Sequence, residues 1–308
     1  MNTEYDAIIV GAGPAGLSAA HMLGRARRSV LVIDGAEPRN RFASAMHGVL
    51  GIDNLPPAEL RSRGRTELDP YDVTFIDGQV DQVTASDDAV TAHLDAQTFT
   101  ARALVAATGV TDSLPDVPGL AEHWGTRVLH CPYCHGWEVR GQRLAVIATS
   151  TMSPFQAQLV RQWSDRITAF TAAAEPLDTE TRQRLSARGT TIIPSPVTSV
   201  TVAADGALLL RTEDGVTTPA DAIFLGTALH PRDEFLPEDL VRIDTEHGPL
   251  LRTDPSGRTS HPRIWAAGNI TNLAANVPMS MGAGSAIGGA VNASLMFEDT
   301  DRAIAEMR

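Results

Sequence analysis

Two cysteines, Cys131 and Cys134, stand three positions apart in the segment HCPYCHGWEVRG, residues 130–141, and the 308-residue chain has no other thiol. Two cysteines placed at random would show this separation in roughly one placement in 150, so we interpret the pair as one functional unit. The spacing is compatible with a redox disulfide, with part of a zinc site, with haem attachment through C-x-x-C-H, or with coincidence.

The residues around the pair favour the redox disulfide. Pro132 suits the first position of a helix, which would place Cys131 at a helix N-terminus, where unpaired N–H groups and the dipole favour a thiolate. Four ligands between His130 and His135 cannot readily surround one zinc ion, and no second cysteine cluster exists. Haem attachment requires export, and neither a signal peptide nor a small helical domain is visible. We expect no metal site.

A second group of residues has the spacing of a dinucleotide-binding loop. The opening segment, residues 5–35, alternates an apolar run, a glycine turn, an Ala-rich helical stretch and another apolar run, which predicts a βαβ unit. Gly11, Gly13 and Gly16 form G-x-G-x-x-G, and Asp34 ends the second strand. Glycines let the backbone approach a pyrophosphate at a helix N-terminus, while the acid accepts a hydrogen bond from a ribose hydroxyl. The sequence therefore predicts a dinucleotide site.

Composition limits the partners and the chemistry. The length and the 43% hydrophobic content suffice for a substantial core and suggest two domains. A formal charge of −12 argues against nucleic acid and anionic membranes as partners. All 25 basic residues are arginines, which removes the lysine of Schiff-base and P-loop mechanisms. Because there is no basic leader and no apolar run of membrane-spanning length, we expect a cytoplasmic protein, in which a static structural disulfide would be unusual.

The rest of the chain repeats the alternation of strands and helices. ALVAATG, residues 103–109, predicts a strand, and the turn-rich VTDSLPDVPGL after it resembles a crossing between domains. Strand and helix patterns alternate again from Leu144 to about Asp244. RIWAAGNI, residues 263–270, predicts a buried strand, and GAGSAIGGAVNASLMF, residues 282–297, predicts a small-residue helix packed closely on a flat surface. We therefore expect two related α/β lobes, with the cysteines at the start of the second.

These motifs together resemble the low-molecular-weight thioredoxin reductases: GAGPAG near the start, AATG and VPG in the middle, C-x-x-C, and WAAGN before the last helix. Within that group, CPYCHGWE and RNRFASAMHGVLGID are most similar to the dithiol oxidases that close the disulfides of gliotoxin and holomycin. The resemblance implies an FAD-dependent homodimer with an α/β fold of two Rossmann-like, three-layer domains. The FAD-binding domain would comprise residues 1–115 and 245–308, and residues 116–244 would form an inserted lobe, similar to an NADPH domain, that carries the cysteines.

The resemblance also implies roles for individual residues. Cys134 would face the isoalloxazine, Cys131 would meet the external thiol, and His135 occupies the position of an acid–base aspartate in the reductases. Because an imidazole titrates near neutrality, His135 is expected either to exchange protons with the thiols or to be a plain surface histidine. The implied cofactor-binding residues are Gly11, Gly13, Pro14, Ala15, Gly16, Asp34, Gly35, Arg41, His47, Thr108, Gly109, Gly268 and Asn269.

Some of these positions carry a more specific expectation. His47 lies in a segment that resembles the flavin-proximal loop of the family, and it is either a flavin or substrate contact or an ordinary loop histidine. Asn269 follows Gly268 where the family has Gly-Asp near the flavin ribityl chain, and an amide can still hydrogen-bond there. Tyr133 and Trp137 are expected to pack around the cysteine motif.

One stretch departs from the reductases, which normally carry a second glycine-rich loop for NADPH. Here the matching segment is VIATSTMSP, residues 146–154, with Ala148 and Ser150 where glycines should stand and with Pro154 entering the helix. The segment ITAFTAAAE, residues 167–175, contains no arginine that could hold the 2′-phosphate of NADPH. Neither the pyrophosphate cradle nor the phosphate clamp is recognisable.

The sequence therefore favours an FAD-dependent thiol or dithiol oxidase that forms a disulfide in a small-molecule dithiol or peptide thiol and reduces oxygen to hydrogen peroxide. The alternative is a thioredoxin-like disulfide reductase supplied with electrons by NAD(P)H or ferredoxin. A flavoprotein that has become a binding or sensing module is a third possibility, and the intact C-x-x-C argues against it, because loss of catalysis would remove the reason to keep both sulfurs.

Overall fold

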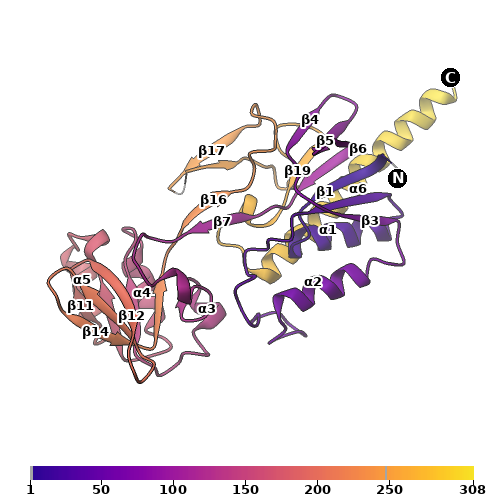
Figure 1. Ribbon diagram of the computed structural model, residues 1–308. Helices are drawn as coiled ribbons and strands as arrows, with labels where there is room; N and C mark the ends of the chain where they lie inside the picture. The colour runs from indigo at the N-terminus through magenta and orange to yellow at the C-terminus, as the bar shows by residue number, and fades with distance from the viewer. Residues whose placement is uncertain (1–2, 247) are drawn as a thin grey trace. The chain divides into compact units, whose positions relative to one another are not determined.

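The computed structural model describes residues 3–246 and 248–308, which divide into two compact units (Figure 1). Of the described residues, unit 1 contains those up to Arg41 together with 49–111 and 229–308, and unit 2 contains 42–48 and 112–228. Each unit is built on a parallel sheet flanked by helices, so the predicted class of two Rossmann-like α/β domains is confirmed. The chain returns to unit 1 at Leu229, whereas the sequence-based division places this return at residue 245.

The described part of unit 1 contains a seven-stranded mixed sheet. Its order is β3 (Val73–Asp77), β2 (Val30–Asp34), β1 (Glu4–Val10), β6 (Gln97–Ala106), β5 (Val90–Leu94) and β4 (Gln82–Ala85), with β19 (Ile264–Ala266) also paired to β6. Strands β1, β2, β3, β6 and β19 are parallel to one another. Strand β5 pairs antiparallel with β6 on one side and with β4 on the other. The carboxyl ends of the parallel strands therefore lie at one edge of the sheet, where nucleotide sites form in this architecture.

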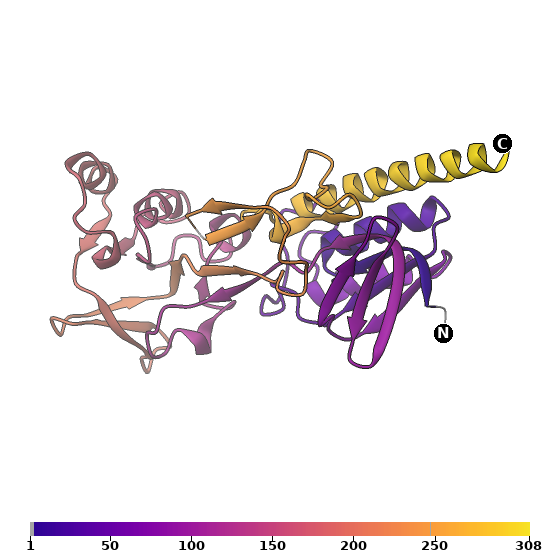
Figure 2. The same cartoon turned by 90° about the horizontal axis from the view of Figure 1, so that it is seen from above.

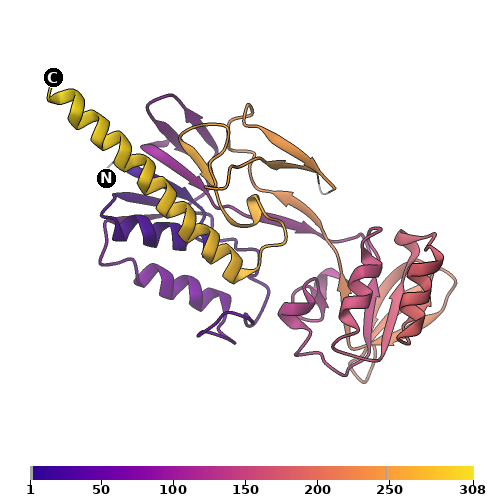
Figure 3. The same cartoon turned by 180° about the vertical axis from the view of Figure 1, so that it is seen from behind.

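Alternating side chains place the two faces of this sheet in different cores. Ile8 and Val10 of β1 face a cluster that includes β4, β5 and Phe235, whereas Ala7 and Ile9 face the helices α1 (Pro14–Arg25) and α6 (Val277–Glu306). All four side chains are buried, which explains why residues 7–10 of the strand form a continuous apolar run rather than an alternating one. Figure 3 shows α1 and α6 running beside each other along the sheet.

The helix α6 packs on α1 with almost no space between the backbones. A Cβ on Gly284 would lie 2.0 Å from the carbonyl oxygen of Ala15, and a Cβ on Gly288 would lie 2.8 Å from that of Ala19. The prediction of a small-residue helix in a close packing is therefore correct, but its contact surface is another helix rather than a flat one. The helix is also longer than predicted, and Figure 2 shows its exposed C-terminal end extending beyond the strands of unit 1.

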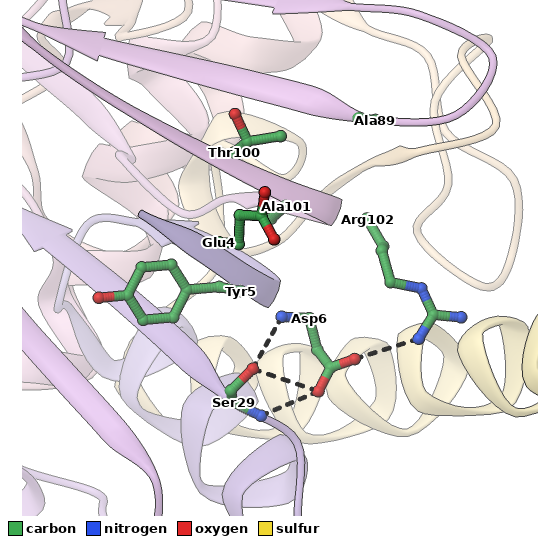
Figure 4. Close-up of a pocket in the computed structure, with 8 residues that line it drawn as sticks. All are labelled: Glu4, Tyr5, Asp6, Ser29, Ala89, Thr100, Ala101 and Arg102. Carbon is green, nitrogen blue, oxygen red and sulfur yellow. Dashed lines mark hydrogen bonds and ion pairs between the residues drawn. The ribbon is translucent and has the colours of Figure 1, made fainter. Parts of the chain in front are cut away.

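An ionic network fastens the C-terminal half of α6 to the start of β1. The Asp6 carboxylate accepts a hydrogen bond from the Ser29 N–H at 3.0 Å and one from Arg102 Nη1 at 3.1 Å. Arg102 also pairs with Glu298 at 3.1 Å and with Asp299 at 2.7 Å on α6. The same region holds a pocket of about 260 Å³ (Figure 4). It is lined by Glu4, Tyr5, Asp6, Ser29, Ala89, Thr100, Ala101 and Arg102.

This pocket lies at the amino end of β1, while a nucleotide is expected at the carboxyl end, where the glycine loop begins. Its charged groups are already paired with one another and with α6. The pocket is therefore a structural feature of the α6 anchor.

Unit 2, all of whose residues are described, contains a five-stranded parallel sheet and a smaller antiparallel one. The parallel sheet has the order β11 (Thr191–Ile193), β10 (Ile167–Phe170), β9 (Leu144–Ile147), β15 (Ala222–Leu225) and β8 (Val128–Leu129). The antiparallel sheet consists of β12 (Val197–Val202), β13 (Leu208–Thr212) and β14 (Thr217–Ala220). The helices α4 (Ser153–Val160) and α5 (Thr179–Ala187) cover one face of the parallel sheet, and the antiparallel sheet covers the other.

The remaining elements are short. The segments that connect the units pair as β7 (Val110–Ser113) and β16 (Ala228–Pro231), and β17 (Arg242–Thr245) pairs with β18 (Gly248–Leu251). The helix α2 (Pro57–Thr66) belongs to unit 1, and the single-turn helix α3 (Pro132–His135) contains the second cysteine. Three 3₁₀ turns are η1 (Ala121–His123), η2 (Ala172–Ala174) and η3 (Gly268–Ile270). Among the described helices, none has both the length and the apolar character needed to cross a membrane.

The α1–α6 contact predicts opposite effects for two glycine substitutions in the same helix. Gly284→Ala should destabilise the protein by roughly 1–3 kcal/mol, because the new methyl group meets the Ala15 backbone. Gly289→Ala should stabilise it by up to about 1 kcal/mol, because no described atom lies within 4 Å of the new methyl group and alanine favours the helix. Thermal unfolding of the two variants measures the difference, and equal shifts in Tm would contradict the packing described.

Candidate active site

The glycine loop follows β1 and is shaped by two close approaches of the backbone. Gly11 has a φ of +102°, and a Cβ there would lie 2.6 Å from the carbonyl oxygen of Ala107. A Cβ on Gly16 would lie 1.9 Å from the carbonyl oxygen of Gly11. Both glycines are therefore required by the packing of the protein itself.

Gly13 differs, because no described atom lies within 4 Å of the position its Cβ would take. It is the N-cap of α1 in an extended conformation, and its missing side chain leaves the first turn of the helix without a side-chain cap. Pro14 and Ala15 begin the helix. An open helix N-terminus without a side chain in front of it has room for a pyrophosphate. The residues of this loop therefore fit a dinucleotide.

Asp34 ends β2 beside this loop and is almost fully buried. One carboxylate oxygen accepts a hydrogen bond from the Ala12 N–H at 3.0 Å, and the other pairs with Arg61 of α2 at 2.5 Å. Each oxygen keeps a second lone pair for a ribose hydroxyl. The sequence analysis missed Arg61, because several arginines in α2 follow a pattern that an exposed, charged helix also shows.

The other predicted cofactor residues of unit 1 follow its parallel strands. Gly35 comes directly after β2, and Arg41 donates a hydrogen bond to the Pro38 carbonyl at 3.2 Å. Thr108 follows β6 and donates its hydroxyl to the Arg232 carbonyl at 2.6 Å, and Gly109 next to it has a φ of +71°. These contacts fix the loops at the carboxyl edge of the sheet.

Gly268 and Asn269 follow β19 at the same edge. Gly268 has a φ of +82°, and a Cβ there would lie 3.0 Å from the Ala15 methyl group. The Asn269 amide donates to the carbonyl oxygens of Asn272 at 3.0 Å and Ala275 at 2.9 Å. The amide at this position therefore holds the loop that leads into α6.

Cys131 and Cys134 form a disulfide in unit 2, with their Cα atoms 5.3 Å apart. Cys131 is the N-cap of α3 and Pro132 follows at the start of the helix. The prediction that Cys131 lies at a helix N-terminus is therefore confirmed. The Cys131 sulfur accepts a hydrogen bond from the Cys134 N–H at 3.2 Å. This donor stabilises negative charge on Cys131 when the disulfide is opened. No group of residues within 3–246 and 248–308 has the arrangement of a metal site.

Two aromatic residues beside the disulfide are mostly exposed. The exposed fraction is 73% for Tyr133 and 65% for Trp137, so the prediction that they pack around the motif is wrong. The reason is that α3 is a single turn at the surface of the unit. Tyr133 contacts the edge of Trp163 at a ring distance of 5.6 Å, and the Arg140 guanidinium lies 4.1 Å from the Trp137 ring.

His135 follows Cys134 and is partly buried. Its Nδ1 has no hydrogen-bond partner among the described residues. Burial lowers the pKa of His135 below its ordinary value, an effect opposed by the Glu138 carboxylate and the Cys131 backbone and reinforced by His47. The imidazole is therefore neutral over a wider pH range than a free histidine, which leaves a nitrogen able to accept a proton.

His47 belongs to unit 2 through the segment 42–48. Its Nε2 lies 3.6 Å from Oε1 of Glu138, and both residues act on the pKa of His135. The sequence left His47 either as a flavin or substrate contact or as an ordinary loop histidine, and Glu138 was not predicted. The acidic residue three positions after His135 in CHGWE is the signal that could have indicated it.

The loop of unit 2 that stands where the reductases carry their NADPH loop is closed by its own hydrogen bonds. The Ser153 hydroxyl accepts hydrogen bonds from the N–H groups of Thr149 at 2.9 Å and Ser150 at 3.2 Å, and Ser153 is only 5% exposed. The Ala148 N–H donates to the Phe170 carbonyl at 2.8 Å. The N–H groups that would hold a pyrophosphate in this loop are thus used within the protein.

A nucleotide cradle in one Rossmann-like unit and a redox-type disulfide in the other define a nucleotide-dependent disulfide oxidoreductase. The model of the pyridine nucleotide-disulphide oxidoreductase family matches residues 5–288, and the chain belongs to this family. It is an FAD-dependent enzyme of the thioredoxin-reductase-like type.

Relatives of this type cover almost the whole chain. The thioredoxin reductase tcpT of Claviceps purpurea is 32% identical over 95% of this chain and 95% of its own length. The thioredoxin reductase sirT of Leptosphaeria maculans is also 32% identical, over 96% of this chain and 95% of its own. The crystal structure of HlmI matches with a TM-score of 0.91 and 37% identity, over 99% of this chain and 97% of that one.

The open space at Gly13 predicts a variant that folds but loses its cofactor. Gly13→Val should reduce the FAD content of the purified protein to a small fraction of the parent's, because the new side chain projects where the pyrophosphate must approach. Far-ultraviolet circular dichroism should be unchanged, since no protein atom is displaced. Gly289→Val, another substitution into open space, serves as control and should keep FAD. Retention of FAD by Gly13→Val would show that the cofactor does not bind at this loop.

Proposed function

We propose that the protein is a thiol or dithiol oxidase that forms a disulfide in a small-molecule dithiol or peptide thiol, with oxygen as the final acceptor. The observation that carries this proposal is the loop of unit 2, where Ser153 uses the N–H groups of Thr149 and Ser150. The absence of a recognisable cradle and arginine clamp for NADPH favours thiols as the source of the electrons.

The proposed reaction begins with the attack of a substrate thiolate on the Cys131 sulfur. The Cys131–Cys134 bond breaks, a mixed disulfide forms at Cys131, and Cys134 leaves as a thiolate. The second substrate thiolate then attacks the substrate sulfur of the mixed disulfide, releases the oxidised product and leaves Cys131 as a thiolate. The hydrogen bond from the Cys134 N–H stabilises that leaving group. The cysteine pair has gained two electrons, and two protons have been removed from the substrate.

His135 is proposed to take the proton of the incoming thiol. Its lowered pKa keeps the ring neutral near physiological pH, and its Nδ1 is without a partner in the described part of the chain. FAD, when bound, supplies the two-electron acceptor for the cysteine pair. The cradle residues Gly11, Gly13, Gly16 and Asp34 are proposed to hold it. Transfer of the two electrons to oxygen then gives one hydrogen peroxide per disulfide formed.

The substrate and the assembly are proposed from the resemblance to the dithiol oxidases of the gliotoxin and holomycin type. Similarity to HlmI over nearly the whole chain supports a small-molecule dithiol as the substrate class, and a homodimer in the cytoplasm is expected. The exposed Tyr133 and Trp137 offer apolar surface to such a ligand. The names of the fungal relatives support the alternative, a disulfide reductase that uses NAD(P)H or ferredoxin.

The electron donor separates these two functions. Excess NADPH added to the oxidised holoenzyme under nitrogen should leave the flavin yellow, because the loop of unit 2 has no free cradle for the nucleotide. Dithiothreitol should bleach the flavin under the same conditions. Admission of air should restore the colour with one hydrogen peroxide per flavin. Rapid bleaching by NADPH alone would assign the protein to the reductases.

The two cysteines should give different spectra when replaced singly. Cys131→Ser should leave Cys134 as a thiolate and produce a long-wavelength charge-transfer band with the oxidised flavin, if Cys134 is the sulfur that faces the isoalloxazine. Cys134→Ser should lack this band, and both variants should lose turnover with dithiols. The serine is nearly isosteric, so flavin content should stay at the parent level. A band in Cys134→Ser alone would reverse the two roles.

A further inference from the structure

We propose that Glu138 is a positioning residue that holds His47 and His135 in one proton-transfer array beside the Cys131–Cys134 disulfide. This inference rests on the proposed role of His135 as the base in the thiol reaction. It assigns His47 to the thiol chemistry of unit 2.

The geometry brings three titratable groups together from two separate segments. His135 and Glu138 lie three residues apart at the end of α3, and His47 comes from the segment 42–48. The His47 Nε2 and the Glu138 Oε1 are 3.6 Å apart, and the His47 side chain is mostly buried at 19% exposure. The Glu138 carboxylate also raises the pKa of His135, so its charge acts on that ring as well.

The segment that carries His47 is firmly packed on unit 2. A Cβ on Gly125 would lie 2.5 Å from the Phe42 Cβ, which shows how closely the start of the segment approaches the loop before β8. Met46, next to His47, is 5% exposed. Because the backbone that precedes the histidine is held, the contact with Glu138 costs little additional side-chain order.

The two neighbours act on His135 in opposite directions. Burial lowers the pKa of His135 most, the Glu138 carboxylate raises it, and His47 lowers it. These are the charged side chains that face His135 from its own segment and from the segment 42–48. Arg140, the next cation along the chain, lies over the Trp137 ring. When His135 takes a proton from a substrate thiol, the Glu138 carboxylate stabilises the protonated ring. His47 opposes this stabilisation.

This arrangement predicts opposite pH signatures for two substitutions. In Glu138→Gln the pKa of His135 falls, so the ring stays neutral and active as a base to a lower pH than in the parent. In His47→Gln the pKa of His135 rises, because the lowering effect of His47 is lost. The signs differ although both variants remove a member of the same contact pair. A purely structural role for the pair would give both variants the same pH dependence as the parent.

The measurement is the rate at which dithiothreitol reduces the holoenzyme under nitrogen between pH 5.5 and 9. Bleaching of the flavin absorbance reports this rate. Dividing each variant's rate by the parent's at the same pH removes the titration of dithiothreitol itself. The ratio for Glu138→Gln should be higher at low pH than at high pH, and the ratio for His47→Gln should be lower at low pH than at high pH. At high pH the rate for Glu138→Gln should fall roughly three- to tenfold, less than the ~10²-fold or more expected for loss of the base in His135→Ala.

Glu122→Gln and His123→Gln on η1 are matched controls, since they make the same chemical changes in unit 2 at residues that do not act on the pKa of His135. Their ratios should be flat across the pH range. Histidine Cε1–H signals in NMR spectra of the oxidised holoenzyme provide a second readout. The signal that His135→Ala removes should titrate at lower pH in Glu138→Gln and at higher pH in His47→Gln. Flat ratios for Glu138→Gln and His47→Gln, or shifts of the same sign, would overturn the proposal.

This experiment stays informative if the oxidase proposal fails. A disulfide reductase of the same family also exchanges electrons between its cysteine pair and dithiols. The rate ratios can therefore be measured whether the natural electron donor is NADPH or a dithiol. Bleaching by NADPH together with opposite pH signatures would reject the oxidase proposal and support the proton-transfer array. Flat ratios together with peroxide formation would reject the array and support the oxidase proposal.

Discussion

The close approach of α1 to its two neighbours is the constraint on which unit 1 depends. Gly16 lies against the Gly11 carbonyl on one side of the helix, and Gly284 of α6 lies against the Ala15 carbonyl on the other. Neither contact has room for a methyl group, so the first turn of α1 is fixed between the glycine loop and α6. The backbone N–H groups of that turn are oriented before any ligand arrives, which lowers the cost of binding an anion there.

The two units show that the same topology does not decide what a loop binds. Each unit has a parallel sheet with a loop that leads from a central strand into a helix. In unit 1 the space in front of the helix is open because Gly13 has no side chain, and in unit 2 the corresponding N–H groups are bonded to Ser153. A serine hydroxyl and a glycine hydrogen therefore distinguish the two loops, and function has to be argued from these residues rather than from the fold.

Local sequence patterns predicted the features that depend on neighbouring residues. Cys131 is an N-cap because proline follows it, and the glycine spacing produces the turn before α1. The long-range pairs were not predictable in this way. Arg61 reaches Asp34 across 27 positions, and Glu138 meets His47 from a different segment, so no spacing rule connects them. Exposure of Tyr133 and Trp137 was also missed, because an aromatic residue beside a motif looks the same in sequence whether it packs inward or faces solvent.

The thiol chemistry proposed for unit 2 needs three electrostatic conditions at once. The sulfur displaced in each exchange must leave as a thiolate, the incoming thiol must lose its proton, and that proton must not stay on a group that blocks the next attack. The Cys134 N–H meets the first condition for Cys131, and the partly buried His135 meets the second. The third requires a base whose protonated form is only moderately stable, and burial of His135 opposed by Glu138 produces this balance. Full burial without the carboxylate would make the base too weak, whereas a fully exposed ion pair would hold the proton too firmly.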